Sequence, residues 1–123
     1  MAQENITVTQ EDVEIGTVRI ADEVVGTIVA YAAMEVEGVA ALGGGIDAEA
    51  LSTANYKKLS KGVKVDVNGE SVSVNLEIIL EYGYNIPSTC SQVQKRIKNA
   101  IANMTGLKTT DINIRIAGVA DAG

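Results

Sequence analysis

The chain has 123 residues, of which 46% are hydrophobic and 21% are charged, with a net charge of −6. Its length is typical of one domain with one core, and its composition excludes a disordered chain. The negative charge disfavours nucleic acid and anionic lipid as partners, because both would be repelled.

The first twenty residues are predicted to contain an arm and a strand. Residues 1–12 are polar and are expected to form a flexible arm, whereas residues 13–119 are expected to form a single domain. Apolar residues alternate from Val13 and change phase across Gly16, which is typical of a strand with a bulge. The polar, acidic N-terminus lacks the pattern of a signal peptide, so a cytoplasmic location is expected.

A helix is predicted over residues 22–36, because apolar residues recur there at helical spacing behind two acidic residues. Its core face is expected to hold Val24, Val25, Ile28, Val29, Ala32 and Val36. Gly38 can take the left-handed conformation that ends helices. Residues 40–62 are predicted to form a mobile loop with helical content, in which the glycines 43–45 are a flexible joint.

A β-hairpin is the strongest structural pattern. Val63, Val65 and Val67 alternate with polar residues, and the alternation resumes over residues 72–82. The turn between the two strands is predicted at Asn68-Gly69.

An amphipathic helix is predicted after Pro87, with Thr89 and Gln92 in a capping box and Gly106 as the C-terminal cap. Its buried face is expected to hold Val93, Ile97, Ala100, Ile101 and Met104. A strand with Ile112, Ile114 and Ile116 follows, and residues 120–123 are expected to fray.

The order of these elements predicts an α+β fold. Strand, helix, hairpin, helix and strand make a two-layer β-α-β-β-α-β sandwich of the ferredoxin-like split β-α-β type, with a small, mainly antiparallel sheet and two helices on one face. A sheet of four strands has exposed edges, so self-association by strand addition is conceivable.

No catalytic, cofactor or metal site is predicted. The chain has no histidine, which removes the commonest general base and metal ligand. Cys90, the only cysteine, is expected to be a structural residue, although a helix dipole could activate it. Glu77 and Glu81 would lie about 13 Å apart on one strand, too far for a glycosidase pair. The basic groups around residues 57–64 and 95–98 are interpreted first as solvated surface, second as a protein-docking site and third as an RNA site.

Several segments resemble one family of proteins. From about Val13 to Val119 the chain is similar to the alkaline-shock/general-stress family of bacterial envelope stress response proteins. The resemblance is carried by residues 16–24, 35–39, 81–86, 93–94, 104–107 and 112–119. It implies a small, non-enzymatic, cytoplasmic protein of mainly Gram-positive bacteria. Some members are held at the membrane by a separate membrane-spanning partner and assemble there, and some are linked to lipid metabolism.

The leading hypothesis is a structural or scaffolding protein of the bacterial cell-envelope stress response. It would act through protein–protein contacts at the cytoplasmic side of the membrane, with a membrane-anchored protein partner and a homo-oligomer as the expected assemblies. No nucleic acid, cofactor or direct membrane insertion is expected. The alternative is a regulatory module that binds a lipid-metabolism enzyme or a small ligand. The candidate contact residues are Tyr82, Tyr84, Asn85, Lys95, Arg96 and Asn99.

Overall fold

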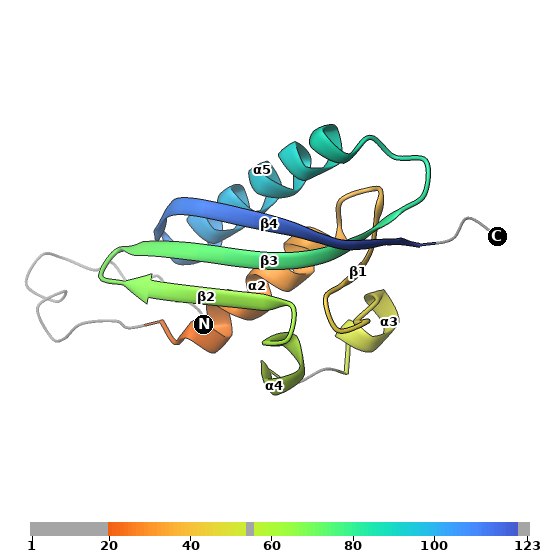
Figure 1. The fold of residues 1–123 in the computed structure, drawn as a ribbon. Helices are drawn as coiled ribbons and strands as arrows, with labels where there is room; N and C mark the ends of the chain where they lie inside the picture. The colour runs from red at the N-terminus through yellow and green to blue at the C-terminus, as the bar shows by residue number, and fades with distance from the viewer. Residues whose placement is uncertain (1–19, 54–55, 121–123) are drawn as a thin grey trace, which may run out of the picture.

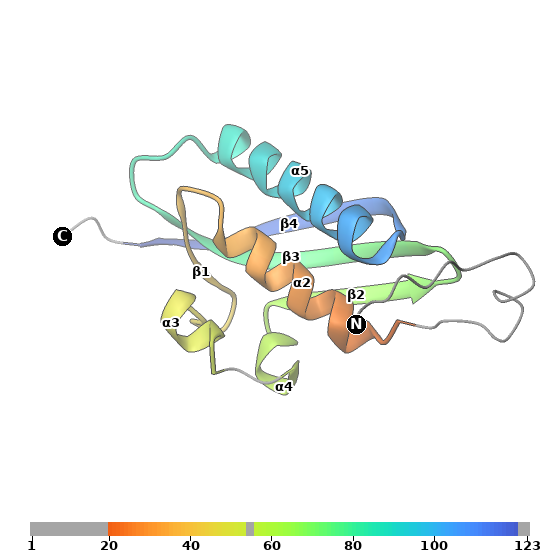
Figure 2. The same ribbon diagram turned by 180° about the vertical axis from the view of Figure 1, so that it is seen from behind.

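The computed structural model describes residues 20–53 and 56–120, which form two layers (Figure 1). One layer is a four-stranded sheet. The other consists of the helices α2 (Asp22–Met34) and α5 (Ile86–Thr105), which lie side by side over one face of the sheet (Figure 2). Among the described residues no helix covers the opposite face, which we call the open face.

Strand β3 (Ser71–Glu81) is the centre of the sheet. On one side, its first half pairs with β2 (Val63–Asn68) and its second half with β1 (Val39–Leu42), both antiparallel. On the other side it pairs along its whole length with β4 (Lys108–Ala120), which runs parallel to it. The α5 helix makes the crossover that a parallel pair requires.

The predicted hairpin is confirmed, with its turn moved by one residue. Asn68 pairs with Ser71, so the two turn residues are Gly69 and Glu70. Gly69 has a φ of +66°, which glycine adopts readily and which type II′ turns need at this position. The even-numbered residues of β3 are buried and make the sheet side of the core: Val72, Val74, Leu76, Ile78 and Leu80.

The α5 helix begins earlier than the predicted capping box requires. Asn85 is its N-cap, and the Asn85 side chain accepts a hydrogen bond from the Ser88 N–H at 2.9 Å. The Thr89 capping box is therefore wrong, because Thr89 lies inside the helix and is buried. Gly106 ends the helix in the left-handed conformation, as predicted. Met104 was expected in the core, but it is 70% exposed.

The α2 helix confirms the predicted helix and ends two residues earlier than expected. Val25 and Val29 are fully buried, whereas Val24 is 51% exposed and lies off the core face. Gly38 follows the helix with a φ of +104° and turns the chain into β1. None of the helices in residues 20–53 and 56–120 is both long and apolar enough to cross a membrane.

The segment 40–62 has the predicted helical content in α3 (Ala48–Leu51) and α4 (Tyr56–Leu59), but strand β1 was not predicted. The glycines 43–45 form a hydrogen-bonded turn in place of a flexible joint. The Gly43 N–H donates to the Glu77 carbonyl at 2.7 Å, and the Gly45 N–H donates to the Leu42 carbonyl at 3.1 Å. This turn fixes the end of β1 against β3.

The α+β class, the two helices on one face and the mainly antiparallel sheet are confirmed, since two of the three strand pairings are antiparallel. The ferredoxin-like topology is not confirmed. Such a fold places another strand between the two strands that α5 connects, whereas here β3 and β4 are direct neighbours. The strand predicted over residues 13–20 lies, except for Ile20, outside the described residues, as do the arm and residues 121–123.

Candidate functional site

The open face of the sheet presents rows of polar side chains that cross the strands. The register places Asn75 of β3 between Lys64 of β2 and Asn113 of β4. The Asn113 Nδ2 donates to the Asn75 Oδ1 at 3.3 Å. No residue of β3 on this face is aromatic, so it lacks the stacking platform that RNA-binding sheets use.

Two further rows carry charge. The Ser73 hydroxyl of β3 donates to the Asp111 Oδ2 of β4 at 2.5 Å. The Arg115 Nη1 of β4 lies 3.5 Å from the Glu77 Oε2 of β3, and the Arg115 side chain is 82% exposed. An ion pair this exposed contributes less than about 1 kcal/mol to folding. Arg115 therefore remains available for contacts outside the protomer.

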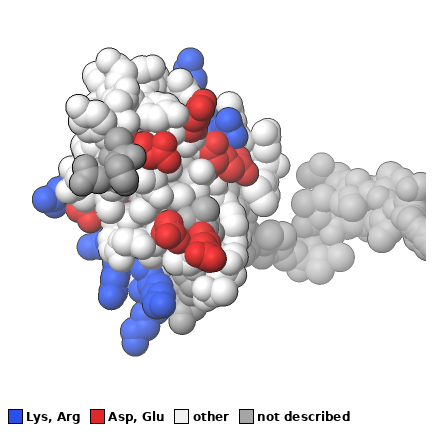
Figure 3. Space-filling view, turned by 90° about the vertical axis from the view of Figure 1, so that its right-hand side faces the viewer, with Lys and Arg blue, Asp and Glu red and all other residues white. Residues whose placement is uncertain are grey.

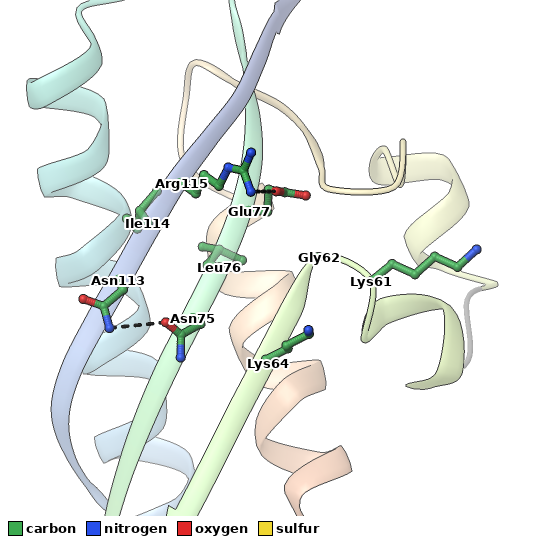
Figure 4. Close-up of a pocket in the computed structure, with 9 residues that line it drawn as sticks. All are labelled: Lys61, Gly62, Lys64, Asn75, Leu76, Glu77, Asn113, Ile114 and Arg115. Carbon is green, nitrogen blue, oxygen red and sulfur yellow. Dashed lines mark hydrogen bonds and ion pairs between the residues drawn. The ribbon is translucent and has the colours of Figure 1, made fainter.

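A shallow hollow of about 280 Å³ lies on this face. Figure 4 shows that Arg115 reaches Glu77 and that Asn113 reaches Asn75, whereas Lys61 extends away from the others. Three cationic residues and one carboxylate line the hollow, and they do not converge on one point. The lining residues are Lys61, Gly62, Lys64, Asn75, Leu76, Glu77, Asn113, Ile114 and Arg115. Sequence reasoning missed this hollow, because Arg115 is far from Lys61 and Lys64 in the chain.

The predicted contact residues at the end of β3 have different surroundings. Tyr82 is 69% exposed, whereas Asn85 is engaged as the cap of α5. The Tyr84 ring lies against Gly38, where an added Cβ would be 2.7 Å from Tyr84 Cδ2. Partial desolvation, the charges of Glu37 and Glu81 and a hydrogen bond to Glu37 raise the pKa of Tyr84.

The end of the molecule that carries β1, α3 and the β3–α5 corner is acidic. Figure 3 shows that several acidic side chains lie across this end, with basic side chains mainly at its margin. The charges of Glu37 and Glu81 act on the Tyr84 phenol. The hollow on the open face, by contrast, has an excess of cations. The molecule therefore presents surfaces of opposite sign.

The predicted contact residues on α5 form a second, separate group. The Arg96 Nη1 lies 2.9 Å from the Oε1 of Glu35, the C-cap residue of α2, and both side chains are more than half exposed. Lys95 and Asn99 are both exposed, and Lys95 lines the groove between α5 and β4. Lys95 follows Asn85 by ten helical residues, a rise of about 15 Å. The structure therefore does not bring the two predicted groups together.

Metal-ligating side chains and the thiol of Cys90 are the reactive groups to consider in the described part of the chain. Residues 20–53 and 56–120 contain no group of three or more Cys, Asp or Glu side chains arranged to hold a metal ion. The partly buried Cys90 lies in α5, where the helix dipole could lower the pKa of its thiol. Burial has the opposite effect and raises that pKa.

We expect Cys90 to react with iodoacetamide more slowly than free cysteine does at pH 7. The raised pKa leaves less thiolate, and the thiolate is the nucleophile. The measurement is the alkylation rate of the folded protein by mass spectrometry, with the unfolded protein in denaturant as the control. A folded protein that reacts faster than the unfolded one would show an activated thiol.

The chain matches known proteins over most of its length. Residues 10–120 match the model of the alkaline shock protein 23 family, described as having a cell envelope-related function. The chain is 35% identical over 109 residues to the uncharacterized protein YqhY of Bacillus subtilis, a match that covers 89% of this chain and 81% of that protein.

A second relative is considerably longer. The chain is 26% identical over 99 residues to a protein of Streptococcus pyogenes named stress response regulator gls24 homolog. This match covers 80% of the chain and 55% of the relative, so the chain spans about half the length of that protein. No solved structure matches the chain at a significant level.

Proposed function

Since this chain belongs to the alkaline shock protein 23 family, whose described function is cell envelope-related, we propose that it is a non-enzymatic scaffold of the bacterial cell-envelope stress response. It acts through protein–protein contacts at the cytoplasmic side of the membrane. A membrane-anchored protein partner holds it there, and copies of the chain assemble. The name of the streptococcal relative, a stress response regulator, supports the connection to stress.

The open face of the sheet is the observation that carries this proposal. Its polar side chains pair with one another across the strands, as in the Asn75–Asn113 and Glu77–Arg115 contacts, and do not surround a reacting centre. The helices α2 and α5 cover only the opposite face. A broad, polar, mixed-charge surface on which the described residues form only a shallow hollow suits recognition of another protein better than turnover of a small substrate.

Lys95 and Arg96 of α5, on the helix side of the molecule, are a second candidate contact surface, and reversing both charges should weaken capture of the membrane partner about tenfold, equivalent to ~1.4 kcal/mol. The thermal stability should change little, because the Arg96–Glu35 ion pair is exposed and contributes less than about 1 kcal/mol. The experiment is a pulldown from solubilised membranes with the Lys95→Glu, Arg96→Glu variant.

The matched control for this pulldown is Lys57→Glu, which reverses an exposed charge on the distant α4 helix. It should capture the partner as the wild type does. Capture by the α5 variant at wild-type level would remove Lys95 and Arg96 from the interface. Capture of nothing from the membrane fraction by the wild type would contradict the scaffold role itself.

A regulatory module that binds a lipid-metabolism enzyme or a small ligand is the second candidate. The hollow on the open face favours it, because Lys61, Lys64 and Arg115 give this surface an excess of cations that would attract an anionic ligand. The same pulldown separates the two candidates. A membrane-spanning protein among the captured proteins supports the scaffold, and a soluble enzyme supports the regulator.

A further inference from the structure

The outer edge of β4 carries backbone N–H and C=O groups that do not hydrogen-bond to β3. The Lys108 N–H donates to the Glu70 carbonyl at 2.9 Å, and the Tyr82 N–H donates to the Ala120 carbonyl at 3.2 Å. Lys108 and Ala120 of β4 thus direct their backbone groups towards β3. The backbone groups of Asp111, Asn113 and Arg115 point the same way, because these residues also pair with odd-numbered residues of β3.

The intervening residues must therefore direct their backbone groups away from β3. These residues are Ile112 and Ile114. The Gln94 side chain of α5 donates to the Ile112 carbonyl at 3.1 Å, which agrees with this direction and leaves the second lone pair of the carbonyl available. In the described residues, β4 pairs with no strand other than β3. Its outer edge can therefore accept another strand.

The sequence of this edge is complementary to itself. Residues 111–115 read Asp-Ile-Asn-Ile-Arg, and the ladder to β3 is regular along them, with irregularities only before and after. If two copies pair antiparallel with Asn113 opposite Asn113, each Asp111 lies opposite the Arg115 of the other copy. Opposite charges at directly facing positions stabilise a strand pair.

We propose that the β4 edge, centred on Asn113, pairs antiparallel with the same edge of a second copy of this chain and joins the two sheets into one. Ile112 and Ile114 of the two copies exchange backbone hydrogen bonds across a two-fold axis. Arg115 then lies between Glu77 of its own chain and Asp111 of the other. The inference rests on the proposed contact role and names a second copy as one partner.

The side chains at this edge also favour pairing. Ile112, Ile114 and Ile116 pack against the core but are only partly buried. In the antiparallel pair, Ile112 of each copy faces Ile114 of the other, so the pairing removes the remaining apolar surface from water. The regular stretch is short, so the contact should be concentration-dependent rather than permanent.

The outer edge of β2, a strand that pairs only with β3 in the described residues, is a weaker candidate. Lys64 and Asp66 flank Val65 there and would also face each other in an antiparallel pair. However, the chain enters α2 beside β2, and α2 packs against that strand (Figure 1). The β4 edge lies on the far side of β3 from that entry.

A cysteine at the two-fold axis tests the pairing directly. In a Cys90→Ser background, Asn113→Cys should form an intermolecular disulfide under mild oxidation, because residues 113 would face each other about 4.5 Å apart between their Cα atoms. Asn75→Cys is the matched control. It lies on the same face one strand inward, about 14 Å from its copy in the proposed pair, and should stay monomeric on a non-reducing gel.

A charge exchange tests the register by sedimentation velocity over a concentration series. Asp111→Arg and Arg115→Asp should each abolish the dimer, because like charges then face each other. The double variant Asp111→Arg, Arg115→Asp should restore it. Thermal melts of all three confirm that they fold.

Three results would overturn the inference: cross-linking of Asn113→Cys no faster than Asn75→Cys, single variants that dimerise normally, or a double variant that stays monomeric. A disulfide through Val65→Cys instead would assign self-association to the β2 edge. Capture of the membrane partner is measured separately on the same variants. A wild type that captures the partner but never dimerises contradicts only this inference, and a dimer without any partner contradicts only the scaffold role.

Discussion

Gly38→Ala should lower the free energy of unfolding by about 3 kcal/mol, from two additive causes. Gly38 has a φ of +104°, where a side chain is strained, and the new Cβ would lie 2.7 Å from Cδ2 and 2.9 Å from Cγ of the Tyr84 ring. The ring must move to relieve this contact. The measurement is chemical denaturation, supported by a fall in melting temperature of about 12 °C.

Gly83→Ala is the matched control, because Gly83 has a φ of +99° in the same corner but no atom within 4 Å of an added Cβ. It should lose only the conformational part, about 1 kcal/mol. The Gly38→Ala, Tyr84→Ala double variant should lose less than the sum of its single variants, since it has no ring to displace. Equal losses in Gly38→Ala and Gly83→Ala would show that the ring contact costs nothing.

The alkaline titration of Tyr84 supplies a second readout of the same contact. Desolvation, Glu37 and Glu81 raise the pKa of this phenol above about 10 in the folded protein. The unfolded chain therefore loses its proton first, and the stability that Tyr84 contributes is complete below pH 10 and is lost as the pH rises through the folded pKa. In Gly38→Ala the pKa should fall towards its ordinary value. An unchanged phenolate absorbance titration would mean that the ring has not moved.

Gly62→Ala should lower the free energy of unfolding by about 2 kcal/mol. An added Cβ would lie 2.7 Å from both the backbone N and O of Gly43, and backbone atoms cannot rotate away as a side chain can. The chain at Gly43 and the chain at Gly62 are also both hydrogen-bonded to Glu77 of β3. The Gly43 N–H donates to the Glu77 carbonyl at 2.7 Å, and the Glu77 N–H donates to the Gly62 carbonyl at 2.8 Å. Thermal and chemical denaturation measure the loss.

The control for this substitution is Gly118→Ala in β4, where no atom lies within 4 Å of an added Cβ and φ is not positive. Its stability should stay within about 0.5 kcal/mol of the wild type. If Gly62→Ala were equally neutral, the junction between β1 and β2 would be loosely packed. The glycines would then be dispensable there.

The elements that sequence predicted best have strong local patterns. The β2–β3 hairpin follows from strict alternation, and α2 and α5 follow from helical spacing and, for α5, its glycine cap. Strand β1 was missed because Val39–Leu42 is short and does not alternate. The neighbouring positions of β3 and β4 were also missed, since strand order depends on contacts between distant segments and leaves no local pattern.

The residues that meet on the open face were not grouped from the sequence for the same reason. Asn85 was predicted as a contact residue, and its side chain also caps α5. Lys64 and Arg115 seemed unrelated in the sequence, yet both line the hollow on the open face. The glycine at position 43 looked like part of a flexible joint, although its close contact with Gly62 is a tertiary one. Residues that meet only through the sheet register cannot be grouped before that register is known.

The direct pairing of β3 with β4 has a consequence for synthesis of the protein. The contact between Ser73 and Asp111 joins residues 38 positions apart, so in the described residues one long side of β3 has no partner until β4 has left the ribosome. The hairpin and α5 can form earlier, because their contacts are local. During that interval the nascent chain exposes an unsatisfied strand, and binding by a chaperone would protect it from aggregation.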